Sequence, residues 1–259
     1  INNQLFMKLK IISIFIVLLI SNHSWCQNST IEVHKTKNGE IKIQPILHSS
    51  FILTYNNKTI YVDPTGGEKL YIGLKSPDII LITDIHGDHL DLITLDSIDT
   101  SKAIFIVPKD VASKLPEKYK SKIIILNNGQ GIHRFDFFIN AIAMYNLPEV
   151  VDSKHPKGRG NGYILTVDEK RIYISGDTED IPEMRMLQNI DIAFICMNLP
   201  YTMDINQAAS AVLEFQPKIV YPFHYRGKDG FSDVKEFKNS VNSKNKTIDV
   251  RLLKWYPNN

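Results

Sequence analysis

Apolar residues recur along this chain in short runs separated by polar and turn residues. After a polar lead over residues 28–39, four runs are rich in Ile, Val, Tyr and Phe. Asn56-Asn57 between two of them is typical of a hairpin turn. The runs predict strands over 41–46, 50–55, 59–62 and 79–82. A second series predicts strands over 103–107, 122–126, 137–143, 162–167, 171–174, 191–196 and 219–223.

Helical periodicity is clearest over residues 204–215, where apolar side chains recur every three or four positions. Asp204 is a natural N-cap, Gln207 completes a capping box, and Pro217 ends the helix. Shorter helices are predicted over 90–97, 109–114, 181–187 and 232–241. Because hairpins come first and strands then alternate with helices, the pattern predicts two sheets packed face to face, with helices outside.

The length and composition fit one large core. The chain has 259 residues, of which 43% are hydrophobic and 22% charged, and no repeat or Pro/Gly/Ser-rich linker divides it. We therefore expect a single domain over residues 27–259, with its regular elements between about Ile31 and Tyr256.

Residues 1–26 are typical of a secretory signal peptide. Lys8 and Lys10 precede a run of ten residues over 11–20 that is apolar except for Ser13, about half of the roughly 20 residues that a membrane-spanning helix needs. We expect cleavage near Cys26 and an exported protein, either periplasmic or secreted. A lipid anchor on Cys26 is the alternative, which the bulky Trp25 before it disfavours, and an uncleaved anchor is disfavoured by the short run.

Charge and cysteine content limit which classes of binding partner and which disulfides we expect. Removing Lys8 and Lys10 lowers the Lys+Arg count from 30 to 28, which equals the Asp+Glu count of 28. This balance does not favour a nucleic-acid partner, and we expect a small-molecule substrate and no stable membrane anchor. Only Cys196 remains after cleavage beyond Cys26, so no internal disulfide is expected. The oligomeric state is not predicted.

The strongest chemical signal is Asp84-Ile85-His86-Gly87-Asp88-His89, directly after the predicted strand 79–82. Four side chains of the metal-ligating type lie within six residues, and Gly87 permits the sharp turn that lets them converge. A solvated acidic loop is the alternative. No Gly-x-Ser-x-Gly elbow and no Gly-rich phosphate loop occurs, and Cys196 lies in an apolar run typical of a core residue.

The motif and the order of elements resemble the metallo-β-lactamase superfamily, whose signature is His-x-His-x-Asp-His at a strand end. The chain is most similar to the ascorbate-phosphate-lactonase-like branch, over about residues 41–253. This resemblance implies an α/β (α+β) fold, a four-layer αββα sandwich. It rests on four further segments: His48-Ser49-Ser50-Phe51, Val62-Asp63-Pro64, Ser175-Gly176-Asp177-Thr178 and Tyr221-Pro222-Phe223-His224.

The resemblance also implies the metal ligands. The second site of the family is complete, with Asp88, His89 and His224 and with Asp177 as the bridging carboxylate. The first site keeps His86 but has Asp84 and Asn146 where the family has His. We therefore expect one tightly bound divalent ion, Zn²⁺ or Mn²⁺, at the second site and a weaker one at the first, where Asp84 and the Asn146 carbonyl suit a hard cation such as Mn²⁺.

Residues outside the motifs complete the candidate site. His155 lies in a basic, Gly-rich loop and either replaces the missing imidazole, contacts substrate, or is an exposed loop residue. His48 is either an active-site group or a structural histidine. His34 and His133 receive no role.

Substrate contacts fall on the same loop and two tyrosines. Lys154, Lys157 and Arg159 are candidates for binding an anionic substrate group, with a solvated basic loop as the alternative. Tyr145 and Tyr201 are candidates for the pocket wall.

The implied activity is metal-dependent hydrolysis. In this interpretation Asp88 and Asp177 have the catalytic roles, because they position the metal and its hydroxide, which attacks a lactone, ester, amide or phosphodiester bond. The sequence does not choose among these bonds, and β-lactamase activity is not favoured. The alternative is a catalytically impaired protein of the same fold that acts in ligand binding or regulation, since Asp84 and Asn146 depart from the family pattern.

Overall fold

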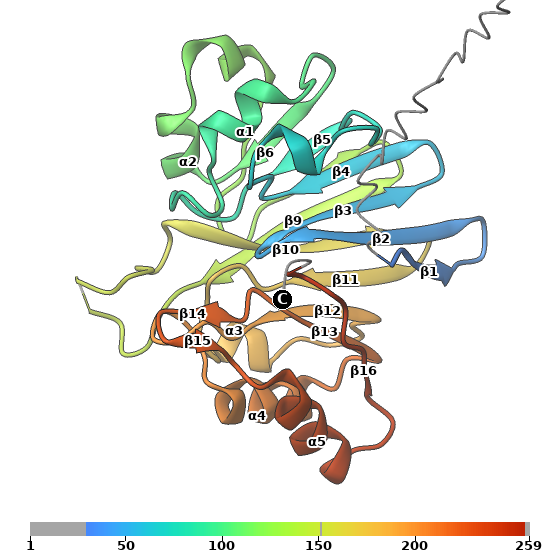
Figure 1. Cartoon of the computed structure of the whole chain (residues 1–259), viewed down its shortest axis with the longest axis vertical. Helices are drawn as coiled ribbons and strands as arrows, with labels where there is room; N and C mark the ends of the chain where they lie inside the picture. Colours follow the sequence, from blue (N-terminus) through green and yellow to red (C-terminus); the bar gives the residue numbers. More distant parts are fainter. Residues whose placement is uncertain (1–29, 151, 257–259) are drawn as a thin grey trace, which may run out of the picture.

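Two seven-stranded sheets face each other, and helices cover both outer surfaces (Figure 1). This computed structural model describes residues 30–150 and 152–256. The predicted αββα sandwich is therefore confirmed. The predicted signal peptide, 1–26, lies outside the described residues and stays a prediction, as do the domain boundaries. Among the described residues, no helix is long and apolar enough to cross a membrane.

The first sheet takes its strands in chain order. Neighbours from β1 to β4 run antiparallel, whereas those from β4 to β7 run parallel. The strands are β1 (Glu32–Lys35), β2 (Glu40–Leu47), β3 (Ser50–Tyr55), β4 (Lys58–Val62), β5 (Ile79–Leu81), β6 (Ile104–Val107) and β7 (Ile123–Ile125).

The second sheet repeats this scheme in the order β16-β13-β12-β11-β10-β9-β8. Neighbours from β8 to β11 are antiparallel, and β11, β12, β13 and β16 pair in parallel. The strands are β8 (Gly131–Arg134), β9 (Phe137–Met144), β10 (Gly160–Val167), β11 (Lys170–Ile174), β12 (Ile192–Cys196), β13 (Ile219–Phe223) and β16 (Asp249–Val250). β14 (Arg226–Gly227) and β15 (Gly230–Phe231) form a separate small hairpin.

Helices α1 (Leu92–Ser97) and α2 (Lys109–Lys114) cover the first sheet, and α3 (Pro182–Arg185), α4 (Ile205–Phe215) and α5 (Val234–Lys244) cover the second (Figure 1). Two 3₁₀ helices, η1 (Glu68–Leu70) and η2 (Glu117–Lys122), lie in the first half of the chain. The predicted capping box of α4 is confirmed, because Asp204 and Gln207 each accept a hydrogen bond from the other's backbone N–H.

Successive side chains of a strand point to opposite faces of the sheet, and in the first sheet both faces are buried. Phe51 and Leu53 of β3 point into the core between the sheets, where the Phe51 ring stacks on Phe194 with centroids 4.2 Å apart. Ile52, one residue along, joins the layer beneath α1 and α2. Since both faces are buried, the strands appear in the sequence as continuous apolar runs.

The predicted strands all occur within one or two residues of their expected bounds, but β1 was missed in the polar lead. Its side chains are half-buried or exposed, and its pairing with β2 holds it at the edge of the sheet. Edge strands of this kind lack the apolar run that a buried strand needs. The short strands β8, β14, β15 and β16 were missed for similar reasons of length and exposure.

Five loops meet at one end of the sandwich. The loop after β5 contacts the start of β10, because the backbone N–H of Asn161 donates to the Thr83 carbonyl at 2.9 Å. The residue after β13, His224, donates its backbone N–H to the His48 carbonyl in the β2–β3 turn at 3.2 Å. The loop after β11 likewise meets the one after β9, where Glu179 N–H donates to the Tyr145 carbonyl at 2.9 Å. This end therefore gathers the predicted chemical residues.

Candidate metal centre

His89 is held in place by Asp63, a residue that the sequence analysis used only as a family marker. The Asp63 carboxylate accepts hydrogen bonds from Thr83 N–H at 2.8 Å and from the Thr83 hydroxyl at 2.6 Å, and it lies 2.8 Å from His89 Nδ1. With Nδ1 engaged in this way, His89 Nε2 points toward the cluster with its lone pair available, as is usual for a metal-ligating histidine.

His89, Asp177 and His224 form one group of candidate ligands. His89 Nε2 lies 3.3 Å from Asp177 Oδ2, and His224 Nε2 lies 3.1 Å from Asp177 Oδ1. The two imidazole Nε2 atoms are 3.1 Å apart. Asp88 is more exposed and stands beside this group, with Oδ2 3.5 Å from His224 Nε2. The four predicted second-site residues are thus brought together.

Asp84, His86 and His155 form a second group, on the other side of Asp177. His86 Nδ1 lies 2.8 Å from Asp84 Oδ2, and His155 Nε2 lies 3.9 Å from the same oxygen. His155 Nε2 is also 3.3 Å from Asp177 Oδ2. Asp177 therefore stands between the two groups, where a bridging carboxylate would lie.

The residues present fit a divalent metal. In each group, the candidate donor atoms lie within 4.8 Å of one another. His155 Nε2 and Asp177 Oδ1 are buried and make no hydrogen bond in the structure. Buried polar atoms normally have partners, so nitrogen and oxygen atoms that converge here without a hydrogen bond are suited to ligating a cation. Imidazole and carboxylate donors suit Zn²⁺ and Mn²⁺.

The electrostatics of the cluster point the same way. Burial alone raises the pKa of the Asp177 carboxyl, but the neighbouring His224 and His89 outweigh it and hold that pKa well below its ordinary value. For His89, burial lowers the pKa, whereas Asp177 and Asp63 raise it well above the ordinary value. Buried carboxylates of this kind stabilise added positive charge, which a proton or a metal ion can supply.

Comparison with known proteins fits this geometry. The family model of the β-lactamase superfamily domain matches residues 42–224. The chain belongs to this superfamily. A metal-dependent hydrolase of the UPF0173 group from Pyrococcus horikoshii is 31% identical over 226 residues, which cover 83% of this chain and 96% of the relative.

Solved structures of the superfamily agree in fold. A protein from Parabacteroides distasonis, described as a metal-dependent hydrolase, is 40% identical, with a TM-score of 0.78, covering 88% of this chain and 100% of that one. Igni18, a metallohydrolase from Ignicoccus hospitalis, is 25% identical with a TM-score of 0.69, covering 83% and 95%. The lactonase-like branch within the superfamily stays a prediction.

Asn146 stands where the superfamily usually has a histidine, but its side chain faces the protein. Its amide NH₂ donates to the Tyr201 carbonyl at 2.9 Å and to Glu179 Oε1 at 3.2 Å. Its carbonyl oxygen accepts from His155 N–H at 2.8 Å and lies 3.1 Å from His155 Nδ1. These contacts do not favour Asn146 as a ligand, and they orient His155 so that its Nε2 faces Asp177.

Asp84 takes the first histidine position of the superfamily signature, and it is fully buried. Both of its oxygens accept hydrogen bonds from Arg159, from Nε at 3.0 Å and from NH2 at 2.8 Å. Arg159 is thus committed to Asp84, and the predicted role in binding substrate is not favoured by its contacts.

His48, for which the sequence allows either an active-site or a structural role, lies against the centre. Its Nε2 is 3.2 Å from Asp88 Oδ2, and its ring centroid is 3.8 Å from that of His224. Nδ1 lies 2.7 Å from the Tyr256 hydroxyl. Burial lowers the pKa of His48 to about 4, so it is neutral near pH 7. Its left-handed backbone, with φ 59°, aims the ring at Asp88.

A cleft of about 340 Å³ opens onto the centre. Lys154 lies in its wall, with its ammonium group 5.6 Å from the centre of the Tyr201 ring. Lys157 is not part of this lining, because it pairs with Glu149 at 3.1 Å and with Glu183 at 3.2 Å. The lining residues are His86, Gly87, Asp88, Lys154, His155, Asp177, Asn198 and Tyr201.

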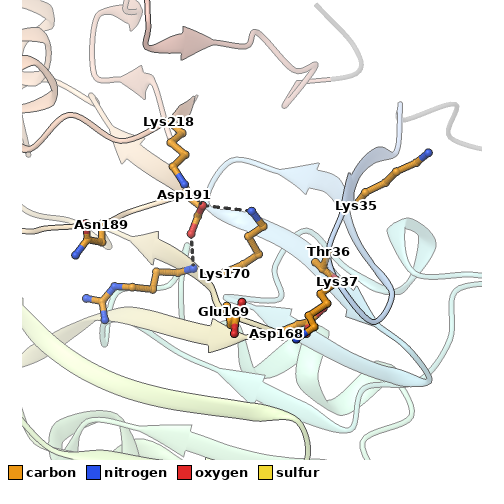
Figure 2. A pocket seen from close by; sticks show the side chains of 10 residues that line it. Lys35, Thr36, Lys37, Asp168, Glu169, Lys170, Asn189, Asp191 and Lys218 are labelled. Carbon is orange, nitrogen blue, oxygen red and sulfur yellow. Dashed lines mark hydrogen bonds and ion pairs between the residues drawn. The ribbon is translucent and has the colours of Figure 1, made fainter.

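A second cavity, of about 460 Å³, lies where β11, β12 and β13 begin, at the opposite end of these strands from the metal centre. Figure 2 shows the side chains that line it. Asp191 at its rim accepts from Lys218 at 2.8 Å, from Lys170 at 3.4 Å and from Arg171 N–H at 3.0 Å. Its lining contains no histidine or cysteine. The larger cavity therefore lacks the imidazole and thiolate donors that Zn²⁺ prefers.

Proposed function

We propose that this protein is a metal-dependent hydrolase that cleaves a lactone, ester, amide or phosphodiester bond in a small substrate with an anionic group. The observation that carries the proposal is the pair of adjacent His/Asp groups at the floor of an open cleft, one containing Asp177 and the other reaching Asp177 through His155 at 3.3 Å. The names of the curated relatives, which are metal-dependent hydrolases, support the same reaction class.

The ligand residues divide the work by position. His89, Asp177 and His224 would hold one ion with Asp88 beside them, and Asp84, His86 and His155 are placed to hold another. A divalent ion would supply Lewis-acid chemistry there: activation of water at neutral pH and polarisation of the oxygen of the bond to be cleaved. Asp63, Asn146 and His48 keep the ligands oriented, so little rearrangement is needed during the reaction.

Lys154 is the candidate for binding an anionic group of the substrate. Among the residues that the structure describes, it forms no ion pair, whereas Lys157 and Arg159 in the same loop are paired with carboxylates. Its ammonium group stands over the Tyr201 ring in the wall of the cleft. An unpaired cation beside the centre can stabilise a carboxylate or phosphate without first breaking an existing ion pair.

Activity with and without metal tests the reaction class. Chelator-treated protein is assayed on lactones, carboxylic esters, amides and phosphodiesters, before and after Zn²⁺ or Mn²⁺ is restored. We expect at least one class to be hydrolysed only with metal. If metal binds and no class is hydrolysed, the protein acts instead in ligand binding.

Matched lysine variants test the anionic substrate. Lys154→Met should raise KM by about tenfold for an anionic substrate, with a smaller effect on a neutral substrate that carries the same bond. Lys157→Met, the control in the same loop, should leave both KM values nearly unchanged. Equal effects of the two variants would remove Lys154 from the proposal.

A further inference from the structure

Arg159 and Asp84 form a two-pronged ion pair inside the candidate metal centre. Guanidinium Nε donates to Asp84 Oδ1 at 3.0 Å, and NH2 donates to Oδ2 at 2.8 Å. The same NH2 donates to the Lys154 carbonyl at 2.7 Å, which is a third hydrogen bond that holds the guanidinium in place. Paired contacts of this kind are the strongest that Arg makes with a carboxylate.

The backbone delivers Arg159 to this position. Asn161 N–H bonds the Thr83 carbonyl, so the start of β10 passes directly over the end of β5, where Asp84 begins the signature loop. Gly160 permits the close approach, because a Cβ there would lie 2.8 Å from the Thr83 carbonyl oxygen and 2.5 Å from Met144 Cε. The pair is therefore a built contact between two sheets.

Asp84 Oδ2 is the oxygen that would contact both the Arg159 guanidinium and a cation bound by this group. It lies 2.8 Å from His86 Nδ1, and it also accepts the hydrogen bond from Arg159 NH2 at 2.8 Å. Arg159 NH2 lies 3.5 Å from His86 Nε2 as well. A cation held by Asp84, His86 and His155 would thus share its carboxylate with a permanent positive charge, and like charges at such separations repel strongly in a buried site.

The other group of ligands has no such neighbour. Within residues 30–150 and 152–256, no Lys or Arg forms an ion pair or hydrogen bond with His89, Asp177 or His224. The two halves of the centre therefore differ in charge although both contain imidazole and carboxylate donors.

We propose that Arg159 is an internal counter-ion that weakens metal binding by the Asp84, His86 and His155 group, so that this group exchanges its ion while the other retains it. This inference rests on the proposed metal dependence of the protein. Arg159 acts through Asp84 and is a positioning residue. Because Arg159 weakens this group, the fraction of protein with an ion bound by Asp84, His86 and His155 depends on the free metal concentration.

Metal titration of chelator-treated full-length protein tests the inference without an activity assay. In the parent, we expect one tight and one weaker equivalent of Zn²⁺. Arg159→Met keeps much of the side-chain volume but removes the charge, and it should tighten the weaker equivalent by about tenfold or more, while the tight one stays within about twofold. Lys157→Met removes a charge from the same loop without touching Asp84, and it should change neither.

Two further variants keep the inference falsifiable. Arg159→Lys retains the charge but not the two-pronged contact, and it should show a smaller gain in the same direction, so it decides the matter if Arg159→Met does not fold. In an Asp84→Asn background, Arg159→Met should have a smaller effect on the weaker equivalent, because the carboxylate that holds Arg159 beside this group is absent. Unchanged or weakened binding of that equivalent in Arg159→Met overturns the inference, whereas loss of all metal binding in the parent overturns the proposed function itself.

Discussion

Both ends of the sandwich carry clustered charged side chains, but the charges are satisfied differently. At the end shown in Figure 2, Asp191 is surrounded by donors from Lys170, Lys218 and the backbone of Arg171. At the metal centre, Asp177 and His155 have buried atoms that converge without a hydrogen-bond partner. The difference shows that function is better located by incomplete pairing in a buried place than by cavity size, since the larger cavity is at the satisfied end.

The largest expected effect comes from Asp177, which belongs to one ligand group and lies 3.3 Å from His155 of the other. Asp177→Asn should lower metal-dependent turnover by at least about a thousandfold, because it removes a charge that lies beside both groups. Metal content, measured by plasma mass spectrometry, should fall with it, and the circular dichroism spectrum should stay close to that of the parent. Asp191→Asn, the same change at the opposite end, is the control and should keep full activity. Retained metal and turnover in Asp177→Asn would contradict the assignment.

A somewhat smaller effect on metal binding is expected at Asn146. Among the described residues that are proposed ligands, its side chain hydrogen-bonds only to His155. Asn146→Ala should lower the affinity of the Asp84, His86 and His155 group by about 10- to 100-fold, as is typical when the partner that orients a ligand is removed. His155→Ala should have at least as large an effect on the same equivalent. If Asn146→Ala weakens metal binding while His155→Ala does not, Asn146 would be a ligand itself.

A modest effect is expected at Tyr256, whose hydroxyl contacts His48. Tyr256→Phe keeps the aromatic ring but removes the hydrogen bond that orients His48 toward Asp88, so kcat should fall by a few-fold, on the order of one lost neutral hydrogen bond. His48→Gln should fall further, because it also changes the contact with Asp88. A comparison of kcat and Tm separates a positioning effect from general destabilisation, and an unchanged kcat in both variants would contradict the role.

The smallest effect is expected at the opposite end and should appear in stability alone. Burial raises the pKa of Asp191, but Lys218, the Arg171 backbone and Lys170 together lower it below the ordinary value. A depressed carboxyl pKa stabilises the fold above the ordinary pKa and loses that stability as the pH falls through the folded pKa. Asp191→Asn should therefore cost about 1 kcal/mol of unfolding free energy near pH 7.

The pH profile of this last variant sharpens the comparison. The difference in unfolding free energy between the parent and Asp191→Asn, measured by urea unfolding, should be constant near neutral pH. It should decrease below about pH 4, where the ordinary carboxyl pKa lies. A difference that widens on acidification would show that Asp191 is protonated in the folded protein.

Local patterns were enough to predict most of the fold. Buried strands such as β3 and β12 appear as continuous apolar runs, and the Asp204 and Gln207 cap marks the start of α4. The edge strand β1 could not be predicted, because its side chains are not buried and its position depends on pairing with β2.

The candidate site was predicted where its residues are neighbours in sequence. The signature from Asp84 to His89 was visible at once, and Asp177 and His224 followed from the family resemblance. The contacts of Asn146 with His155, of Arg159 with Asp84 and of Asp63 with His89 depend on loops brought together by the fold. Such partners have no fixed spacing along the chain, so sequence alone leaves their roles open.

The repeated strand order of the two sheets has a consequence for how the metal centre assembles. Each half of the chain forms its own antiparallel meander followed by parallel strands, and neither half contains a complete set of ligands. The first half contributes Asp84, His86, Asp88 and His89, and the second contributes His155, Asp177 and His224. A bound ion would therefore cross-link the two sheets in addition to the apolar core that they share. Two co-expressed fragments divided near Asn128 should acquire metal only after they have reassembled, and chelation should loosen their association before either sheet unfolds.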